Sequence, residues 1–249
     1  PPRSTPLYSS AASDVYKRQV VGADLAAGLH RVRYDEAFVL QTILAQRRAT
    51  ARALVTTART PRAGGLLEAF DARLPFALTD GQREVGEVLA AELARPTPMH
   101  RLLQGEVGSG KTVVAVRAML AVVDSGGQAA LLAPTEVLAA QHHRSIQLLL
   151  GPLAGAGMLP LGEDASDAPP PEHATQLALL TGSQSAPARR AALDDAATGR
   201  AGIVVGTHAL IQEHVAFEDL GLVVVDEQHR FGVEQRDALR DKGTAPPHE

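Results

Sequence analysis

Short apolar runs alternate with longer segments of mixed character along the chain beyond residue 99. Buried parallel strands are short and almost entirely apolar, and glycine, proline or polar residues commonly bound them. We therefore expect strands at 100–104, 128–133, 177–181, 202–205 and 222–225, and helices at 112–123, 136–150, 187–198 and 233–241. The alternation predicts an α/β fold, with helices on both faces of a parallel sheet and a site formed by the loops after the strands.

Before residue 99, apolar residues recur at the spacing of a helix and the alternation of short apolar runs is absent. Over 34–57 the apolar residues Ala37, Leu40 and Leu44 recur on one face and the polar residues 46–48 lie on the other, which predicts one long helix. Proline and glycine at 61–65 break this helix. A second helix is expected over 80–94, and the prolines within 95–98 end it.

The same patterns divide the chain into parts. Residues 1–19 begin with a coil composition and lack useful periodicity, so we interpret them as a non-native or disordered leader, which in-frame genomic sequence would contradict. We interpret 20–73 as a helical linker from an upstream domain and 74–249 as the main domain. Within it, residues 151–172 are rich in glycine, proline and acidic residues, which predicts a flexible, solvated insertion.

Composition narrows the class of protein. A hydrophobic content of 45% supports a real core, and the chain has neither a membrane-length apolar run nor an opening typical of a signal peptide. With no cysteine as well, we expect a cytoplasmic protein. A net charge of −4 and 3% aromatic residues argue against a broad basic surface or rows of stacking rings, so any contact with nucleic acid must be local. The sequence contains no asparagine, which excludes the guanine-specifying Asn-Lys-x-Asp motif and favours adenine.

A glycine-rich run at 105–112 fits the phosphate-loop pattern G-x-x-x-x-G-K-[ST]. Gly105, Gly108 and Gly110 let backbone N–H groups approach a polyphosphate without a Cβ in the way. Lys111 would reach the β and γ phosphates, and the hydroxyl of Thr112 would bind Mg²⁺. The alternative is a glycine-rich turn that opens an ordinary helix, but an expected strand before the run and an apolar helix after it favour the phosphate loop.

Two carboxylates, Asp226 and Glu227, follow the apolar run 222–225. Asp226 would hold the magnesium ion from the side opposite Thr112, and Glu227 would orient or deprotonate the attacking water. Taken alone, the pair has the alternative of a solvated strand end. Together with the phosphate loop, it indicates an ATP-driven motor domain that uses ATP and Mg²⁺.

In their order along the chain, these motifs resemble the first motor lobe of superfamily 2 helicases, and most closely that of bacterial enzymes that translocate on branched DNA. The resemblance covers roughly 30–249 apart from 151–172 and implies a RecA-like P-loop domain preceded by a bridging helix. The segment 74–79 with Gln82 resembles the adenine-reading motif of the family, which implies that Gln82 hydrogen-bonds adenine while Phe76 packs beside it. An ordinary helix-surface glutamine is the alternative for Gln82.

Three further segments, 132–142, 180–183 and 206–212, resemble the DNA-backbone motifs of the family. The resemblance implies DNA contacts at Pro134, Thr135, Gly182, Thr207 and His208. Strand-end hydroxyls and helix N-terminal N–H groups are natural phosphate donors, so Thr135 can hold a DNA backbone without excess positive charge. Simple turns are the alternative for the second and third segments.

The segment 226–236, with Arg-Phe-Gly at 230–232, is the most specific part of the resemblance. A related lobe in the transcription-repair coupling factor usually has glutamate where this chain has Gln228, and it differs after Gly232. In such motors His229 would couple the state of the phosphate to motion, and the alternative is a histidine that caps the strand end. For His142 and His143 we expect plain positions on a helix surface.

A complete motor of this kind also has a second lobe, whose arginines contribute roughly 10³ to 10⁵ in rate in comparable systems, and an upstream wedge domain. Neither is found in this sequence. We therefore expect the chain to be the nucleotide-binding lobe of a parent DNA helicase that processes replication forks and Holliday junctions in repair and recombination, and to be inactive alone. The alternatives are a module that binds Mg-ATP and DNA without turnover, and the motor lobe of a transcription-repair coupling factor.

Overall fold

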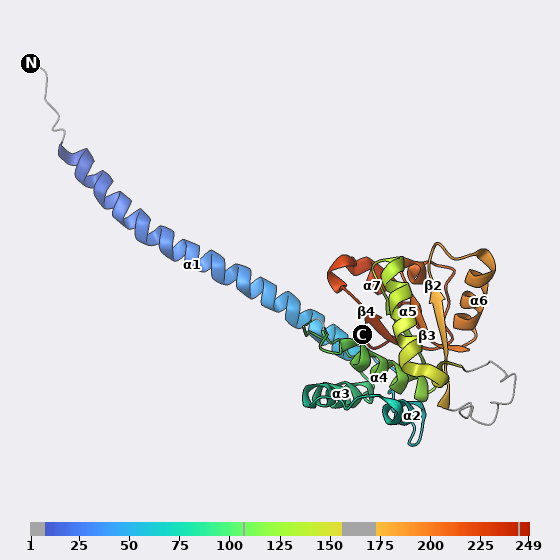
Figure 1. The fold of residues 1–249 in the computed structure, drawn as a ribbon. Helices are drawn as coiled ribbons and strands as arrows, with labels where there is room; N and C mark the ends of the chain where they lie inside the picture. Colours follow the sequence, from blue (N-terminus) through green and yellow to red (C-terminus); the bar gives the residue numbers. More distant parts are fainter. Residues whose placement is uncertain (1–7, 107, 156–172, 244) are drawn as a thin grey trace, which may run out of the picture. The chain divides into compact units, whose positions relative to one another are not determined.

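The computed structural model describes residues 8–106, 108–155, 173–243 and 245–249 (Figure 1). It divides the chain into two units, Pro1–Arg52 and Ala53–Glu249. No helix in these ranges combines the length and the apolar character needed to cross a membrane.

The described residues of the first unit all belong to helix α1, Tyr8–Ala53. The expected helix at 34–57 is confirmed, but it begins earlier and ends at Ala53. Its apolar side chains are exposed within this unit, including Phe38 and Leu40. Residues 1–7 of the expected leader lie outside the described residues and 8–19 belong to α1, so the origin of the leader stays a prediction.

The second unit is an α/β lobe built on four strands. The strands are β1 (Gln128–Leu132), β2 (Gln176–Leu180), β3 (Ala201–Gly206) and β4 (Leu220–Val225). They form one sheet in the order β2-β3-β1-β4, and every pair is parallel. The helices are α2 (Leu66–Arg73), α3 (Asp80–Leu93), α4 (Lys111–Asp124), α5 (Glu136–Leu150), α6 (Ala186–Ala197) and α7 (Val233–Arg240), with short 3₁₀ turns at η1 (Gly151–Ala154), η4 (His208–Ile211) and η5 (Gln228–Arg230).

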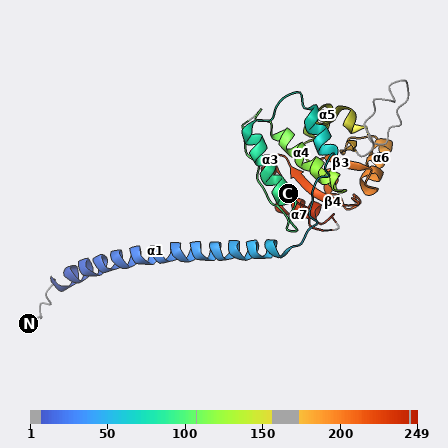
Figure 2. The ribbon, with the colours of Figure 1, turned by 90° about the horizontal axis from the view of Figure 1, so that it is seen from below.

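Two hydrophobic clusters cover the two faces of the sheet, because alternate residues of a strand point to opposite sides. Ala129 and Leu131 of β1 belong to the cluster beneath α2, α3, α4 and α5. Ala130 and Leu132 belong to the cluster beneath α6 and α7. Figure 2 shows the two groups of helices on either side of the strands. The predicted parallel sheet with helices on both faces is therefore confirmed.

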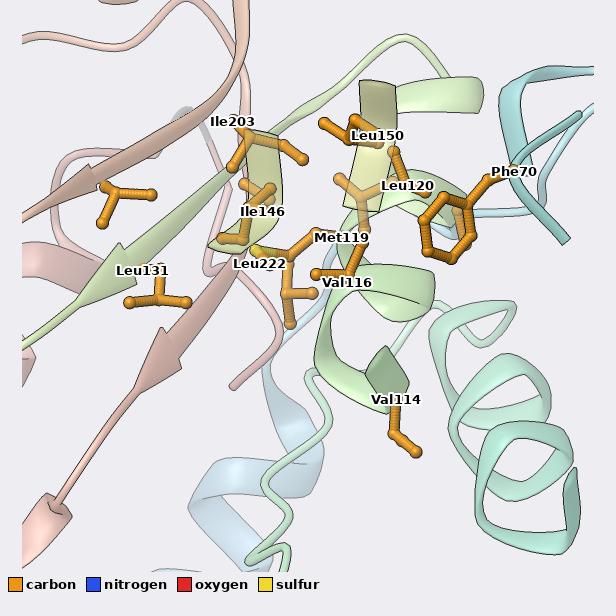
Figure 3. Close-up of a cluster of buried hydrophobic side chains, with 14 of the residues drawn as sticks. Phe70, Val114, Val116, Met119, Leu120, Leu131, Ile146, Leu150, Ile203 and Leu222 are labelled. Carbon is orange, nitrogen blue, oxygen red and sulfur yellow. The ribbon is translucent and has the colours of Figure 1, made fainter. Parts of the chain in front are cut away.

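Helix α4 forms the centre of the first cluster (Figure 3). Val116, Met119 and Leu120 are fully buried, and they share that cluster with Ile146 of α5 and Leu222 of β4. The apolar character of 112–123, noted in the sequence, thus reflects contact with a sheet on one side and with other helices around it. This packing fixes the direction of the helix that follows the glycine-rich run.

Helix α2, which follows the break at 61–65, was not predicted from the sequence. Its first N–H groups are capped from outside the helix: the carboxylate of Asp124, at the end of α4, accepts hydrogen bonds from the N–H groups of Leu66 (2.7 Å) and Leu67 (2.9 Å). Such a cap satisfies donors that a helix start leaves unpaired. Because the capping residue lies far away in sequence, local spacing does not reveal it.

The predicted strand at 100–104 is wrong. This segment is extended but belongs to no strand, and it pairs instead with the segment at 248–249. The N–H of Arg101 donates to the carbonyl of Glu249 at 2.9 Å, and the N–H of His248 donates to Gly221 of β4 at 2.9 Å. Residues 248–249 therefore separate 100–104 from the sheet, which the apolar run could not indicate.

The expected insertion at 151–172 is only partly described. Residues 151–154 form η1, and Gly155 makes an isolated bridge with Gln176 at the start of β2. Residues 156–172 lie outside the described residues, and so does Val107 of the glycine-rich run.

His248 makes the stability of this lobe depend on pH. Its Nδ1 accepts from the N–H of Met99 at 3.2 Å, which requires an unprotonated nitrogen, and burial lowers the pKa of the ring. In the unfolded chain the histidine gains its proton at about pH 6.5, whereas in the folded chain it does so only at lower pH. The contribution of His248 to stability is therefore complete above about pH 6.5 and is lost as the pH falls below that value toward the lower pKa of the folded state.

We expect the urea concentration at the unfolding midpoint to decrease when the pH is lowered from about 7.5 to about 5.5. The decrease should be smaller in His248→Asn, because the side-chain carbonyl of asparagine can accept the hydrogen bond and does not titrate. Burial also lowers the pKa of His100 and His143, so part of the slope should persist. His30→Asn, at an exposed histidine, should keep the full slope. An unchanged slope in His248→Asn would contradict the assignment.

Candidate nucleotide and DNA sites

The glycine-rich run forms a loop that ends at the N-terminus of α4. Gly108 (φ 85°) and Gly110 (φ 80°) adopt left-handed conformations, which side chains with a Cβ rarely tolerate. Gly110 is the N-cap and supplies no side-chain acceptor, so the first N–H groups of α4 are available to an anion. Lys111 and the half-buried Thr112 are the first two residues of the helix. The predicted strand before this loop is replaced by extended chain, but the loop and the helix are as expected.

Lys111 folds back over its own loop. Its Nζ donates to the carbonyl oxygens of Gly105 at 2.7 Å and Glu106 at 2.9 Å. Both acceptors of the ammonium group are therefore backbone oxygens of the loop itself. The ammonium group therefore already lies inside the loop that a polyphosphate would enter.

Gln82 contacts the phosphate loop directly. Its Nε2 donates to the carbonyl of Ser109 at 2.9 Å, and its Oε1 accepts from the N–H of Thr79 at 2.9 Å in the capping box of α3. Phe76 is 47% exposed and lines a hollow with Leu74, Leu78 and other residues of α2 to α4, and Gln82 is not part of that lining. The structure thus joins Gln82 to the loop and not to Phe76, and the adenine-reading role of both residues stays a prediction.

The acidic pair follows β4 at the carboxyl edge of the sheet. The N–H of Asp226 donates to the carbonyl of Leu132 at the end of β1 (2.9 Å), which fixes its backbone. Glu227 adopts φ 51° and ψ 53°, and it is the one residue other than glycine with positive φ in the described part of the chain. Such strain is typical of functional sites. His229 is exposed, with its Nδ1 at 3.4 Å from Oε2 of Glu227.

One hollow is lined both by α4, the helix that follows the phosphate loop, and by residues that flank the acidic pair. Ala115, one turn along α4 from Lys111, lines the same hollow as Val225 and Gln228, which flank the acidic pair. Among the described residues, no group of three or more histidine and acidic side chains could form a metal cage. Mg²⁺ does not need one, because it is usually held by one or two carboxylates, phosphate oxygens and water. Asp226 with the hydroxyl of Thr112 fits that donor set.

The five residues predicted to contact DNA line one hollow at the same edge of the sheet. Pro134 and Thr135 follow β1, Gly182 follows β2, and Thr207 and His208 follow β3; Glu136, Ala209 and Gln212 complete the lining. The hydroxyl of Thr135 accepts from the N–H of Leu138 at 3.2 Å and keeps its own hydrogen for a donor role. Thr207 is only 3% exposed, so at that loop the exposed His208 is the side chain that a ligand can reach.

Glu136 and His142, both on α5, have positions that the sequence analysis missed. Oε1 of Glu136 accepts from the N–H of Ser183 at 3.1 Å, so the residue ties the loop after β1 to the loop after β2. Hydrogen bonding from the side chain of Ser183, with a smaller contribution from its N–H, lowers the pKa of the carboxyl group. Nε2 of His142 lies 2.8 Å from Oδ2 of Asp226, although we expected a plain helix-surface residue. The sequence does place His142 two turns into a helix that starts at the edge of the sheet. That position does not specify Asp226 as its partner.

A family model described as DEAD/DEAH box helicase matches residues 85–246. The chain therefore belongs to the DEAD/DEAH box helicase family, whose members bind nucleotide.

Within this class, the chain is similar to ATP-dependent DNA helicase RecG. It is 54% identical to RecG of Mycobacterium bovis over 220 residues, which are 88% of this chain and 29% of the relative. RecG of Mycobacterium leprae is 51% identical over 88% of this chain and 28% of its own length. For Synechocystis the identity is 45%, over 89% of this chain and 24% of the relative. The chain thus spans less than a third of the length of these relatives.

A solved structure of RecG bound to a three-way DNA junction is similar to the chain in fold as well. The TM-score is 0.65 at 36% identity, over 80% of this chain and 24% of that one. This similarity confirms the expected RecA-like fold.

Gly110 allows a sharp test of the phosphate loop. In Gly110→Ala the new Cβ would collide with Nε2 of Gln82 and force the loop away from its left-handed conformation, so we expect Mg-ATP affinity to fall more than about tenfold. Gly126→Ala is the matched control, since Gly126 has φ 88° but open space around it, beyond the other end of α4. Titration with a fluorescent ATP analogue measures both. Equal affinities in the two variants would argue against a nucleotide site at this loop.

Proposed function

We propose that this chain is the nucleotide-binding lobe of an ATP-dependent DNA helicase that remodels branched DNA, including replication forks and Holliday junctions, in repair and recombination. One observation carries the proposal: the acidic pair and the hollow lined by the five predicted DNA residues lie at the carboxyl edge of one parallel sheet. In open α/β sheets this edge is where ligands bind. The similarity to RecG, whose solved structure holds a three-way junction, supports branched DNA as the partner.

ATP with Mg²⁺ is the nucleotide we propose for the loop. Lys111 would exchange its bonds to the carbonyls of Gly105 and Glu106 for bonds to the β and γ phosphates. Thr112 and Asp226 would hold the magnesium ion, which neutralises charge on the phosphates, and Glu227 would orient the attacking water. His229, exposed beside Glu227, is suited to sensing the phosphate and passing its state to a facing lobe.

DNA would be held through its backbone at the hollow after β1, β2 and β3. The exposed hydroxyl of Thr135, the N–H groups at the start of α5 and the ring of His208 are donors of the kind that contact phosphates. This local arrangement suits a chain whose net charge is −4. We propose that binding of this kind positions DNA without reading its sequence, and that the enzyme acts in the cytoplasm, where bacterial chromosomes lie.

A second motor lobe would complete the catalytic site. Arginines from such a lobe supply roughly 10³ to 10⁵ in rate in comparable systems. We therefore propose that cycles of closing and opening between the two lobes move the enzyme along DNA, and that this chain alone binds Mg-ATP with little turnover.

Lys111→Ala tests the nucleotide half of the proposal. We expect this variant to lose more than about tenfold in Mg-ATP affinity, because no other group of the loop supplies a compact positive charge. Lys242→Ala is the control for nucleotide binding without DNA, since Nζ of Lys242 donates to the carbonyls of Gln212 and Val215 and to none in the phosphate loop. The measurement is nucleotide binding together with ATP hydrolysis, with and without a three-way junction at low salt.

The outcomes separate the alternatives. Mg-dependent binding without hydrolysis, lost in Lys111→Ala, would support a half-site that needs a second lobe. DNA-stimulated hydrolysis that Lys111→Ala removes would mean that the chain completes its own site by self-association. Mg-ATP binding that Lys111→Ala leaves intact would contradict the proposal.

The DNA half is tested at His208. His208→Glu places a carboxylate in the proposed phosphate hollow, and we expect junction affinity at low salt to fall at least about fivefold through charge repulsion. His214→Glu adds the same charge at an exposed histidine that does not line the hollow. Fluorescence anisotropy of a labelled junction compares the two. Equal losses would indicate a general charge effect and not a DNA site at this hollow.

A further inference from the structure

His142 connects the two candidate sites through a single helix. It lies two turns into α5, and the first turn of α5 carries Thr135 as its N-cap at the proposed DNA hollow. The rise of a helix separates the two positions by roughly 10 Å. At that distance from the hollow, Nε2 of His142 meets Oδ2 of Asp226 at 2.8 Å, so α5 contacts both the DNA hollow and the proposed magnesium ligand.

Both partners of this contact are held by the core. Ala139 and Ile146, on the same side of α5 as His142, are fully buried, so the helix cannot turn without disturbing the first hydrophobic cluster. Asp226 is fixed through its N–H to the carbonyl of Leu132. The His142 ring is 21% exposed and the Asp226 carboxylate 36% exposed, so the contact lies at the edge of the core and not in free solvent.

The geometry leaves a metal-binding oxygen on Asp226. The histidine bonds Oδ2, and the other carboxylate oxygen can face a magnesium ion at the same time. Groups that donate hydrogen bonds to a metal-binding carboxylate orient it, and their loss typically costs roughly 10- to 100-fold in metal affinity. If His142 instead occupied the position of the metal on Asp226, it would have to be displaced before the ion could bind.

We propose that His142 is a positioning residue: its Nε2–H donates to Oδ2 of Asp226 and holds the carboxylate in the orientation that receives Mg²⁺. This inference rests on the proposed function, because it takes Asp226 as a magnesium ligand. It means that α5, the helix that begins at the proposed DNA contact Thr135, also supports the metal site through His142. Any movement of α5 on DNA binding then reaches Asp226 through one hydrogen bond.

The test is the magnesium dependence of nucleotide binding by this chain. A fluorescent ATP analogue is titrated at fixed concentration with Mg²⁺, and its binding in excess EDTA is measured separately. For His142→Leu we expect the half-saturating Mg²⁺ concentration to rise about tenfold while binding in EDTA is unchanged. His142→Gln can present its own Nε2–H to Asp226 and should restore most of the shift.

His143→Leu is the matched control. His143 is the next residue of α5, is half-buried and bonds the backbone near Leu177 rather than Asp226, so it reports any general effect of losing a histidine from the helix. Circular dichroism and urea unfolding confirm that each variant is folded.

Three results would overturn the inference. An unchanged magnesium requirement in His142→Leu, or a lowered one, would show that His142 does not support the ligand or that it competes with the metal. An equal rise in His143→Leu would show a structural effect of the helix. If the unsubstituted chain binds nucleotide independently of Mg²⁺, the proposed function fails first and this inference falls with it.

Discussion

Parallel pairing of β1 between β3 and β4 is the constraint on which the rest of the lobe depends. Leu132 is in register with Gly206 on one side and with Val225 on the other, so three strands end together. Two hydrogen bonds continue that alignment beyond the strands, from the N–H of Ala133 to Gly206 and from the N–H of Asp226 to Leu132. Because the strands are parallel, the loops that leave them emerge at one edge. The acidic pair and the proposed DNA hollow are neighbours for this reason.

Core packing transmits this alignment to the helices that carry functional side chains. Met119 and Leu120 hold α4 against the sheet, which fixes the direction of its open N-terminus toward the phosphate loop. Ala139 and Ile146 hold α5 in the same cluster, and with it Thr135 and His142. Groups on rigid elements keep their geometry better than groups on free loops. The strained backbone at Glu227 is tolerated because the strands on which it depends are buried.

The sequence analysis succeeded where a pattern is local and failed where a partner is distant. The glycines of the phosphate loop and the apolar strands 128–133 and 222–225 can each be recognised from a few consecutive residues. The segment 100–104 has the same apolar character, yet it forms no strand, and residues 248–249 pair with β4 instead. Helix α2 depends on the carboxylate of Asp124, and the placement of Gln82 depends on the carbonyl of Ser109. None of these pairings has a signature in local spacing.

The sequence by itself determined the fold class, the phosphate loop, the acidic pair and the order of the strand-end motifs, because backbone preferences and hydrophobic periodicity act over short stretches of chain. Only the tertiary structure decided which of those groups meet. It gathered Pro134, Thr135, Gly182, Thr207 and His208 into one hollow, folded Lys111 over its loop and joined His142 to Asp226. Contacts between residues far apart in sequence depend on strand order and helix packing across the whole core, and one stretch of sequence does not contain that information.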